Sequence, residues 1–191
     1  MTGIHFALDG NIKYAVVCLM ISGVCDMFDG PVARHAKRTD REKSFGIQID
    51  SLADVIAFGV FPAVIGYAVS AGHFGAAVSL VIISLYVLAA LIRLGYFTII
   101  EMELQSRSEK RKYYEGLPVT SVALIIPMIY SICLYFDISF SVTYNVVLVV
   151  LAIAFVSKVK IPKIRGRYLI IFCVIGLPFI IYILLAGGIQ I

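Results

Sequence analysis

Four aspartates at regular intervals are the residues of this chain best suited to chemistry. Asp26 and Asp29 are three residues apart, while Gly46, Asp50 and Asp54 follow one another at intervals of four. On helices, each of these sets would occupy one face. Converging carboxylates supply the hard oxygen ligands that Mg²⁺ and Mn²⁺ prefer, and two such ions would neutralise charges that could not otherwise share a site. The spacing therefore predicts a centre for divalent cations.

The residues beside the aspartates favour a phosphate-bearing ligand. Gly30, Ala33 and Gly46 let a ligand approach the backbone or a helix face closely, and Arg34 offers a planar fork for phosphate oxygens. A pyrophosphate is the ligand that this arrangement favours. Metal ions that bridge phosphate oxygens would make a site for phosphoryl transfer, with one carboxylate left to accept a proton from an alcohol.

Membrane-spanning helices must hold these residues in place. The chain has 191 residues, of which 61% are hydrophobic and 15% charged, and its mean hydropathy of +0.97 is far above what a soluble domain of this size could bury. We expect an all-α fold, a polytopic membrane helix bundle that forms one domain over residues 1–191. About six spans are predicted, near residues 11–28, 47–71, 75–100, 117–136, 140–157 and 168–187.

The basic residues of the connecting loops predict the orientation in the membrane. Residues 34–43 carry five Lys or Arg, residues 107–112 carry four and residues 158–167 carry five, whereas the turns at 71–74 and 137–138 carry none. The positive-inside rule then places the three basic loops, and with them the four aspartates, at the cytoplasmic face of the cell membrane. We expect a multi-pass protein surrounded by membrane lipids, with both termini outside and no nucleic-acid partner.

The pattern of the aspartate stretch resembles a known signature. D-x2-D-G-x2-A-R followed by G-x3-D-x3-D, over residues 26–54, is similar to the signature of the CDP-alcohol phosphotransferase family at eight fixed positions. The resemblance covers about residues 15–120. It is strongest to the phosphatidylserine synthase branch, through the motifs Ser51-Leu52-Ala53-Asp54, Phe58-Gly59-Val60, Pro62-Ala63, Arg93-Leu94 and Gly116-Leu117-Pro118.

That resemblance implies an activity: transfer of a phosphatidyl group from CDP-diacylglycerol to the hydroxyl of L-serine in phospholipid biosynthesis, with release of CMP. It also implies a homodimer that uses Mg²⁺ or Mn²⁺, with two ions per site. Asp26, Asp29 and Asp50 would be metal ligands, and Asp54 would be both a ligand and the general base. The residues that would line the CDP site are Gly30, Ala33, Arg34 and Gly46.

Two further residues are candidates for substrate contact. Ser44 is the candidate for the hydroxyl that members of the family place just before the glycine. Arg93, in the inner part of the third predicted span, could pair with the serine carboxylate, extend toward the membrane interface, or hold Glu101 or an aspartate. The sequence leaves these alternatives open.

The chain departs from the family pattern in two places. The 11 residues between Arg34 and Gly46 make a longer gap than the family usually has, which predicts an extra turn or bulge within His35–Phe45. Only Met1–Asp9 precedes the first predicted span, where the family has a complete span. The first residues lack the basic start and apolar stretch of a cleaved export signal, so no such signal is expected.

Two alternative functions follow from the same residues. The first is the same chemistry on another alcohol, such as glycerol 3-phosphate or inositol. The second belongs to a different class, a membrane cation transporter or channel, because carboxylates clustered within a membrane also mark ion pathways. A transporter would place carboxylates at mid-membrane depth on several spans, whereas here they lie near the inner ends of two predicted helices.

Overall fold

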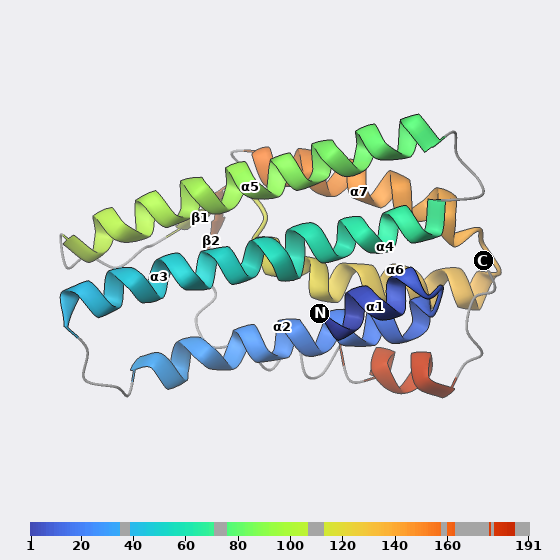
Figure 1. Ribbon diagram of the computed structural model, residues 1–191, viewed down its shortest axis with the longest axis horizontal. Helices are drawn as coiled ribbons and strands as arrows, with labels where there is room; N and C mark the ends of the chain where they lie inside the picture. The colour runs from blue at the N-terminus through green and yellow to red at the C-terminus, as the bar shows by residue number, and fades with distance from the viewer. Residues whose placement is uncertain are drawn as a thin grey trace.

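The computed structural model describes residues 1–34, 39–70, 76–106, 113–157, 160–162, 176 and 178–185. Within these ranges the chain is almost wholly helical, and Figure 1 shows the long helices lying side by side along one axis. Residues 178–185 are also helical. The predicted all-α membrane bundle is therefore confirmed. Its α-helices are α1 (Thr2–Leu8), α2 (Ile12–Arg34), α3 (Asp40–Asp54), α4 (Phe61–Ser70), α5 (Ala76–Ser106), α6 (Val122–Phe136) and α7 (Phe140–Val156).

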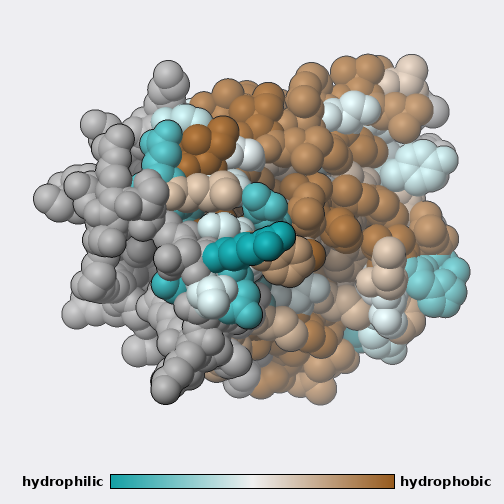
Figure 2. Space-filling model, turned by 60° about the vertical axis from the view of Figure 1, so that its left-hand side comes forward, coloured by the Kyte–Doolittle hydropathy of each residue, from teal (hydrophilic) through white to brown (hydrophobic). Residues whose placement is uncertain are grey.

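The lengths and surfaces of these helices are those of a membrane protein. Three helical stretches in the described part of the chain are long and apolar enough to cross a membrane, namely Arg41–Ser70, Ala77–Glu103 and Val119–Phe136, and Phe140–Val156 is a shorter apolar helix. Large apolar side chains cover the outside of the bundle, and in Figure 2 they form a broad hydrophobic surface. Hydrophilic side chains gather beside it at one end. The sixth predicted span, 168–187, falls largely outside the described residues.

The helix that carries Asp50 and Asp54 is longer than the apolar run predicted. It starts at Asp40 rather than near residue 47, because Thr39 and Glu42 form a capping box. The Thr39 N–H donates to Glu42 Oε2 at 2.7 Å, and the Glu42 N–H donates to Thr39 Oγ1 at 3.4 Å. The cap, and not the apolar run, sets where this helix begins.

The same helix continues without interruption to Ser70. Between α3 and α4 it passes through a π-helical segment, η1 (Val55–Val60), in which the Phe61 N–H donates to the Ile56 carbonyl five residues earlier. Residues 40–45 form regular α-helix, and residues 35–38 of the predicted bulge lie outside the described part. The irregularity seen in this helix therefore follows Asp54.

The polar end of the bundle gathers the ends of three helices. Figure 1 shows the end of α2, the start of α3 and the end of α5 at the same end of the molecule. The helices α3 and α5 pack against each other, α4 packs against α1, α5 and α7, and α2 packs against α1 and α6. The core between them is apolar, with Leu19, Ile65, Ile126 and Leu148 fully buried. This packing fixes the aspartate helix against the rest of the bundle.

A short strand pair that the sequence did not predict ties two connections together. Strand β1 (Tyr113–Glu115) pairs antiparallel with β2 (Lys160–Pro162), and Glu115 lies opposite Lys160. Strands of three residues are too short to show an alternating pattern. The pairing brings the segment that follows α5 and the segment that follows α7 to one place in the fold.

Gly116, directly after β1, holds this connection close to α7. Its φ of +76° lies in the left-handed region, and a Cβ at this position would stand 2.6 Å from the Ser157 carbonyl oxygen. The next residue donates from the Leu117 N–H to the Ala154 carbonyl at 3.3 Å. Glycine is therefore required here for both its conformation and its size.

Replacing Gly116 with alanine is expected to destabilise the fold by about 2 kcal/mol or more, because it combines left-handed strain with a backbone clash. A thermal unfolding scan of the protein in detergent measures the effect. Gly95→Ala is the matched control, since a Cβ there meets nothing within 4 Å, and alanine in a helix interior stabilises by about 0.5–1 kcal/mol. Equal melting temperatures for the two variants would contradict this role of Gly116.

Candidate active site

The first pair of aspartates lies in the second half of α2. Asp26 is half-buried, and the backbone of Asp29, Gly30, Ala33 and Arg34 continues the helix to its end. The predicted span ended near residue 28, so the helix extends through the whole first half of the signature. The side chains of residues 29–34 lie outside the described part, and their predicted contacts remain predictions.

The second pair lies on α3, one helical turn apart. Asp50 is exposed and Asp54 is half-buried, while Gly46 and Ser44 precede them on the same helix, both half-buried. The spacing of four therefore does place Gly46, Asp50 and Asp54 along one face. Asp54 is the last residue of regular α-helix before η1 begins.

Helix α2 packs against the aspartate helix mainly beyond Asp54, at η1 and α4. Among the side chains that the structure describes, no three His, Cys, Asp or Glu residues come close enough together to hold a metal ion. Asp29 is not among those side chains. The donors themselves are carboxylates on helices at one end of the bundle, which fit a hard divalent cation.

A hydrogen bond between two helices fixes the stretch between Asp50 and Asp54. The hydroxyls of Ser51 on α3 and Thr98 on α5 lie 2.7 Å apart. The Thr98 hydroxyl also donates to the Leu94 carbonyl at 2.8 Å, so the Ser51 hydroxyl is left to donate to Thr98. The aspartate helix is thereby held to α5 at the level of the predicted site.

The structure gives Arg93 defined partners. Its side chain is buried on α5, with 6% of its surface exposed, and it donates from Nε to the Leu117 carbonyl at 3.2 Å and from Nη2 to the Gly116 carbonyl at 3.1 Å. Arg93 anchors the connection between β1 and α6, and its predicted contact with substrate stays a prediction.

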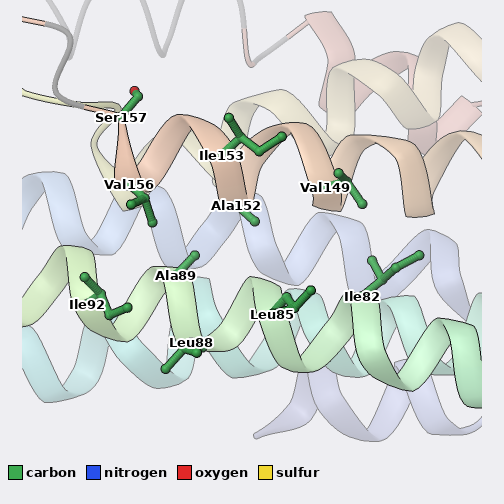
Figure 3. A pocket seen from close by; sticks show the side chains of 10 residues that line it. All are labelled: Ile82, Leu85, Leu88, Ala89, Ile92, Val149, Ala152, Ile153, Val156 and Ser157. Atoms are coloured by element: carbon green, nitrogen blue, oxygen red, sulfur yellow. The ribbon is translucent and has the colours of Figure 1, made fainter.

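A cavity of about 540 Å³ lies apart from these residues. Figure 3 shows it as a groove between α5 and α7, and none of the predicted site residues lines it. Its walls are apolar except at Ser157, so it offers no ligands for a metal or a phosphate. The residues that line it are Ile82, Leu85, Leu88, Ala89, Ile92, Val149, Ala152, Ile153, Val156 and Ser157.

Two buried tyrosines beside η1 were missed from the sequence. The Tyr86 hydroxyl on α5 donates to the Phe58 carbonyl at 2.6 Å, and the Tyr144 hydroxyl on α7 donates to the Pro62 carbonyl at 2.8 Å. Pro62 was the available signal, because a proline inside a helix leaves the carbonyl four residues earlier without its α-helical donor. Its partner could not be identified from the sequence, since Tyr86 is 28 residues further along the chain than Phe58.

Comparison with known proteins identifies relatives with the same signature region. The sequence family described as CDP-alcohol phosphatidyltransferase matches residues 1–159. The CDP-diacylglycerol–serine O-phosphatidyltransferase of Saccharomyces cerevisiae is 36% identical over 135 residues, which cover 68% of this chain and 47% of the yeast protein. That of Helicobacter pylori is 32% identical over 126 residues, covering 66% of this chain and 49% of its own length.

An archaeal relative matches more of the chain. The archaetidylserine synthase of Methanothermobacter thermautotrophicus is 27% identical over 163 residues, which cover 85% of this chain and 64% of the archaeal protein. The chain thus spans about half to two thirds of the length of these curated relatives. The family match covers most of the chain, including both halves of the aspartate signature. The chain therefore belongs to the CDP-alcohol phosphatidyltransferase family.

Proposed function

We propose that this protein transfers a phosphatidyl group from CDP-diacylglycerol to L-serine, giving phosphatidylserine and CMP. The observation that carries the reaction type is the eight-position signature, held on helices α2 and α3 at the polar end of a membrane bundle. The choice of serine as acceptor is supported by the relatives, whose names specify a serine transferase or a serine lipid.

The residues of the signature divide the work of binding and proton transfer. Gly30, Ala33 and Gly46 leave room for the cytidine diphosphate, and Arg34 offers its guanidinium to phosphate oxygens. The serine hydroxyl oxygen forms a new bond to the phosphatidyl phosphorus, while the bond from that phosphorus to the CMP oxygen breaks. Asp54 accepts the proton that the serine hydroxyl loses.

Asp26, Asp29, Asp50 and Asp54 are the residues that would hold Mg²⁺ or Mn²⁺. A bound divalent cation would neutralise negative charge on the diphosphate and on the departing CMP. A carboxylate beside such cations stays ionised, so Asp54 remains able to accept a proton. Asp54 lies deeper than Asp50, half-buried rather than exposed, which suits the residue that must meet the reacting hydroxyl.

The proposal also assigns a side of the membrane. Residues 34–43, 107–112 and 158–167 carry 14 of the 16 Lys and Arg. Figure 1 shows the end of α2, the start of α3 and the end of α5 at one end of the bundle. By the positive-inside rule this end faces the cytoplasm, where CMP would be released. The enzyme is proposed to be a multi-pass homodimer, as the family resemblance implies.

An acceptor assay tests the proposed function. The purified protein in vesicles containing CDP-diacylglycerol and Mg²⁺ or Mn²⁺ is given L-serine, glycerol 3-phosphate or inositol, and CMP release is measured. We expect release with serine to exceed that with either other alcohol by at least about tenfold, because a site that hydrogen-bonds one substrate leaves buried polar groups unpaired with another.

Two outcomes would contradict the proposal in different ways. Preference for glycerol 3-phosphate or inositol would preserve phosphatidyl transfer and reject serine as the acceptor. Divalent cation flux into sealed vesicles without CMP release would reject the enzyme and support the cation transporter.

A further inference from the structure

The aspartate helix changes its hydrogen-bond register immediately after Asp54. Residues Val55–Val60 form π-helix, and the Phe61 N–H donates to a carbonyl five residues back rather than four. Single π-turns within α-helices are rare and recur at functional sites. The position of this one, directly after the predicted base, separates the part of the helix that carries the carboxylates from the part that packs in the core.

The register change alters which faces of the helix line up. In a continuous α-helix, Asp54, Phe58 and Pro62 would lie one above another at intervals of four. A turn that takes up one extra residue rotates everything beyond it by about one residue position, roughly 100° in an α-helix. The π-segment therefore sets the direction of Asp54 relative to the buried face of α4.

Pro62 leaves the end of this segment in need of a donor. In α-helical register the N–H of residue 62 would donate to the Phe58 carbonyl, and proline has no N–H. Phe58 is 1% exposed, so water does not reach it freely. The Tyr86 hydroxyl supplies the donor at 2.6 Å, from a side chain that is itself fully buried on α5.

A second tyrosine bonds the backbone just after the π-segment. The Tyr144 hydroxyl on α7 donates to the Pro62 carbonyl at 2.8 Å. Gly66, one turn further along α4, makes room for it, because a Cβ there would stand 3.1 Å from the Tyr144 ring. Two neighbouring helices thus each give one hydroxyl to the backbone of the aspartate helix, one within the π-segment at Phe58 and one just after it at Pro62.

We propose that Tyr86 is a positioning residue for Asp54: by bonding the Phe58 carbonyl, its hydroxyl maintains the π-segment that orients the carboxylate. Together with the Ser51–Thr98 bond, this hydrogen bond connects α5 to the aspartate helix both before and after Asp54. The inference rests on the proposed function, in which Asp54 is the base. In this role Tyr86 acts through the backbone of the aspartate helix and not by direct contact with substrate or metal.

Tyr86→Phe tests this role by removing one hydroxyl and nothing else. We expect kcat for CMP release to fall by about 10- to 100-fold, because small displacements of a catalytic group have effects of this size, while KM for CDP-diacylglycerol stays unchanged. Amide hydrogen exchange over residues 55–61 is expected to speed up. Tyr130→Phe is the matched control, an equally buried tyrosine on α6, and it should leave both kcat and exchange in this segment unchanged.

Tyr86 could matter because it orients Asp54 or only because it gives the Phe58 carbonyl a hydrogen-bond donor. Adding Pro62→Ala to Tyr86→Phe distinguishes these two roles. The new N–H can donate to Phe58, which should restore the melting temperature but favours α-register, so kcat should stay low. Recovery of kcat in the double variant would overturn the proposal, as would wild-type kcat in Tyr86→Phe. If Tyr86→Phe does not fold, Pro62→Ala alone decides: we expect lowered kcat at unchanged stability, and wild-type kcat would overturn the proposal.

The exchange measurement also separates this inference from the proposed function. If the wild-type protein releases no CMP with any alcohol, the proposed function fails on that result alone. Tyr86 would still be supported as the residue that stabilises the π-segment if exchange over residues 55–61 is slow in the wild type and in Tyr130→Phe but fast in Tyr86→Phe. Equal exchange in all three proteins would overturn it.

Discussion

Asp54→Asn is expected to reduce kcat for CMP release by about a thousandfold or more, because a positioned general base contributes about 10²–10⁴-fold and asparagine cannot accept the proton. Binding of CDP-diacylglycerol should be largely kept, since three other carboxylates and Arg34 remain. Steady-state CMP release gives kcat, and a binding titration with CDP-diacylglycerol in nanodiscs gives the affinity.

Asp137→Asn is the matched control for this experiment. Asp137 is exposed, ends α6 in left-handed conformation with a φ of 52°, and lies in the turn before α7, away from the signature. Asparagine tolerates that conformation, so this variant should fold and turn over as the wild type does. Near-normal kcat in Asp54→Asn would remove Asp54 from the role of base.

Asp26→Asn is expected to weaken metal and nucleotide binding together. Asp26 is half-buried on α2, and loss of one carboxylate removes both a proposed ligand and the charge that holds the cation. We expect the Mn²⁺ concentration that gives half-maximal activity to rise by at least about tenfold. Electron paramagnetic resonance of Mn²⁺, recorded with and without CDP, measures the affinities for metal and for nucleotide without turnover.

The response of the two aspartate variants to Mn²⁺ distinguishes a metal ligand from a general base. Asp26→Asn should recover part of its activity at high Mn²⁺, whereas Asp54→Asn should not. Unchanged Mn²⁺ affinity in Asp26→Asn would exclude Asp26 as a ligand. Equal rescue of both variants by Mn²⁺ would show that Asp54 acts through metal binding alone.

Local sequence patterns predicted the helices well, because the apolar runs are long and uninterrupted. Helices α5, α6 and α7 lie close to where the spans were placed, whereas α2 begins where predicted but continues beyond residue 28 to Arg34. The family resemblance was confirmed. The start of the aspartate helix was predicted too late because a capping box extends it beyond the apolar run. Hydropathy does not detect such a cap, since the residues that it adds are polar.

The contacts that position the site depend on residues far apart in sequence. Arg93 was recognised as unusual, but its bonds to the Gly116 and Leu117 carbonyls join residues 23 and 24 positions apart. Pro62 is a residue type that disturbs helices, yet a proline alone does not distinguish a kink from a π-segment bonded by a tyrosine. Such interactions follow from how the helices pack, which the hydrophobic pattern leaves open.

The groove between α5 and α7 shows why a cavity alone does not identify this site. Its walls are apolar because it lies between two helices whose outer faces suit lipid. The proposed site instead combines carboxylates and an arginine at the polar end of the bundle. The chemistry of the side chains, and not the volume of the cavity, supports its assignment.

Labelled L-serine tests the proposed transfer reaction most directly, because its incorporation into lipid can be measured. Purified protein in vesicles with CDP-diacylglycerol, Mg²⁺ or Mn²⁺ and isotopically labelled L-serine is sampled over time, and lipid mass spectrometry is set beside CMP release. The proposed reaction gives one labelled phosphatidylserine for each CMP, and both products should be lost in Asp54→Asn. Release of CMP with phosphatidic acid and no labelled lipid, or labelled lipid formed at the wild-type rate by Asp54→Asn, would contradict it.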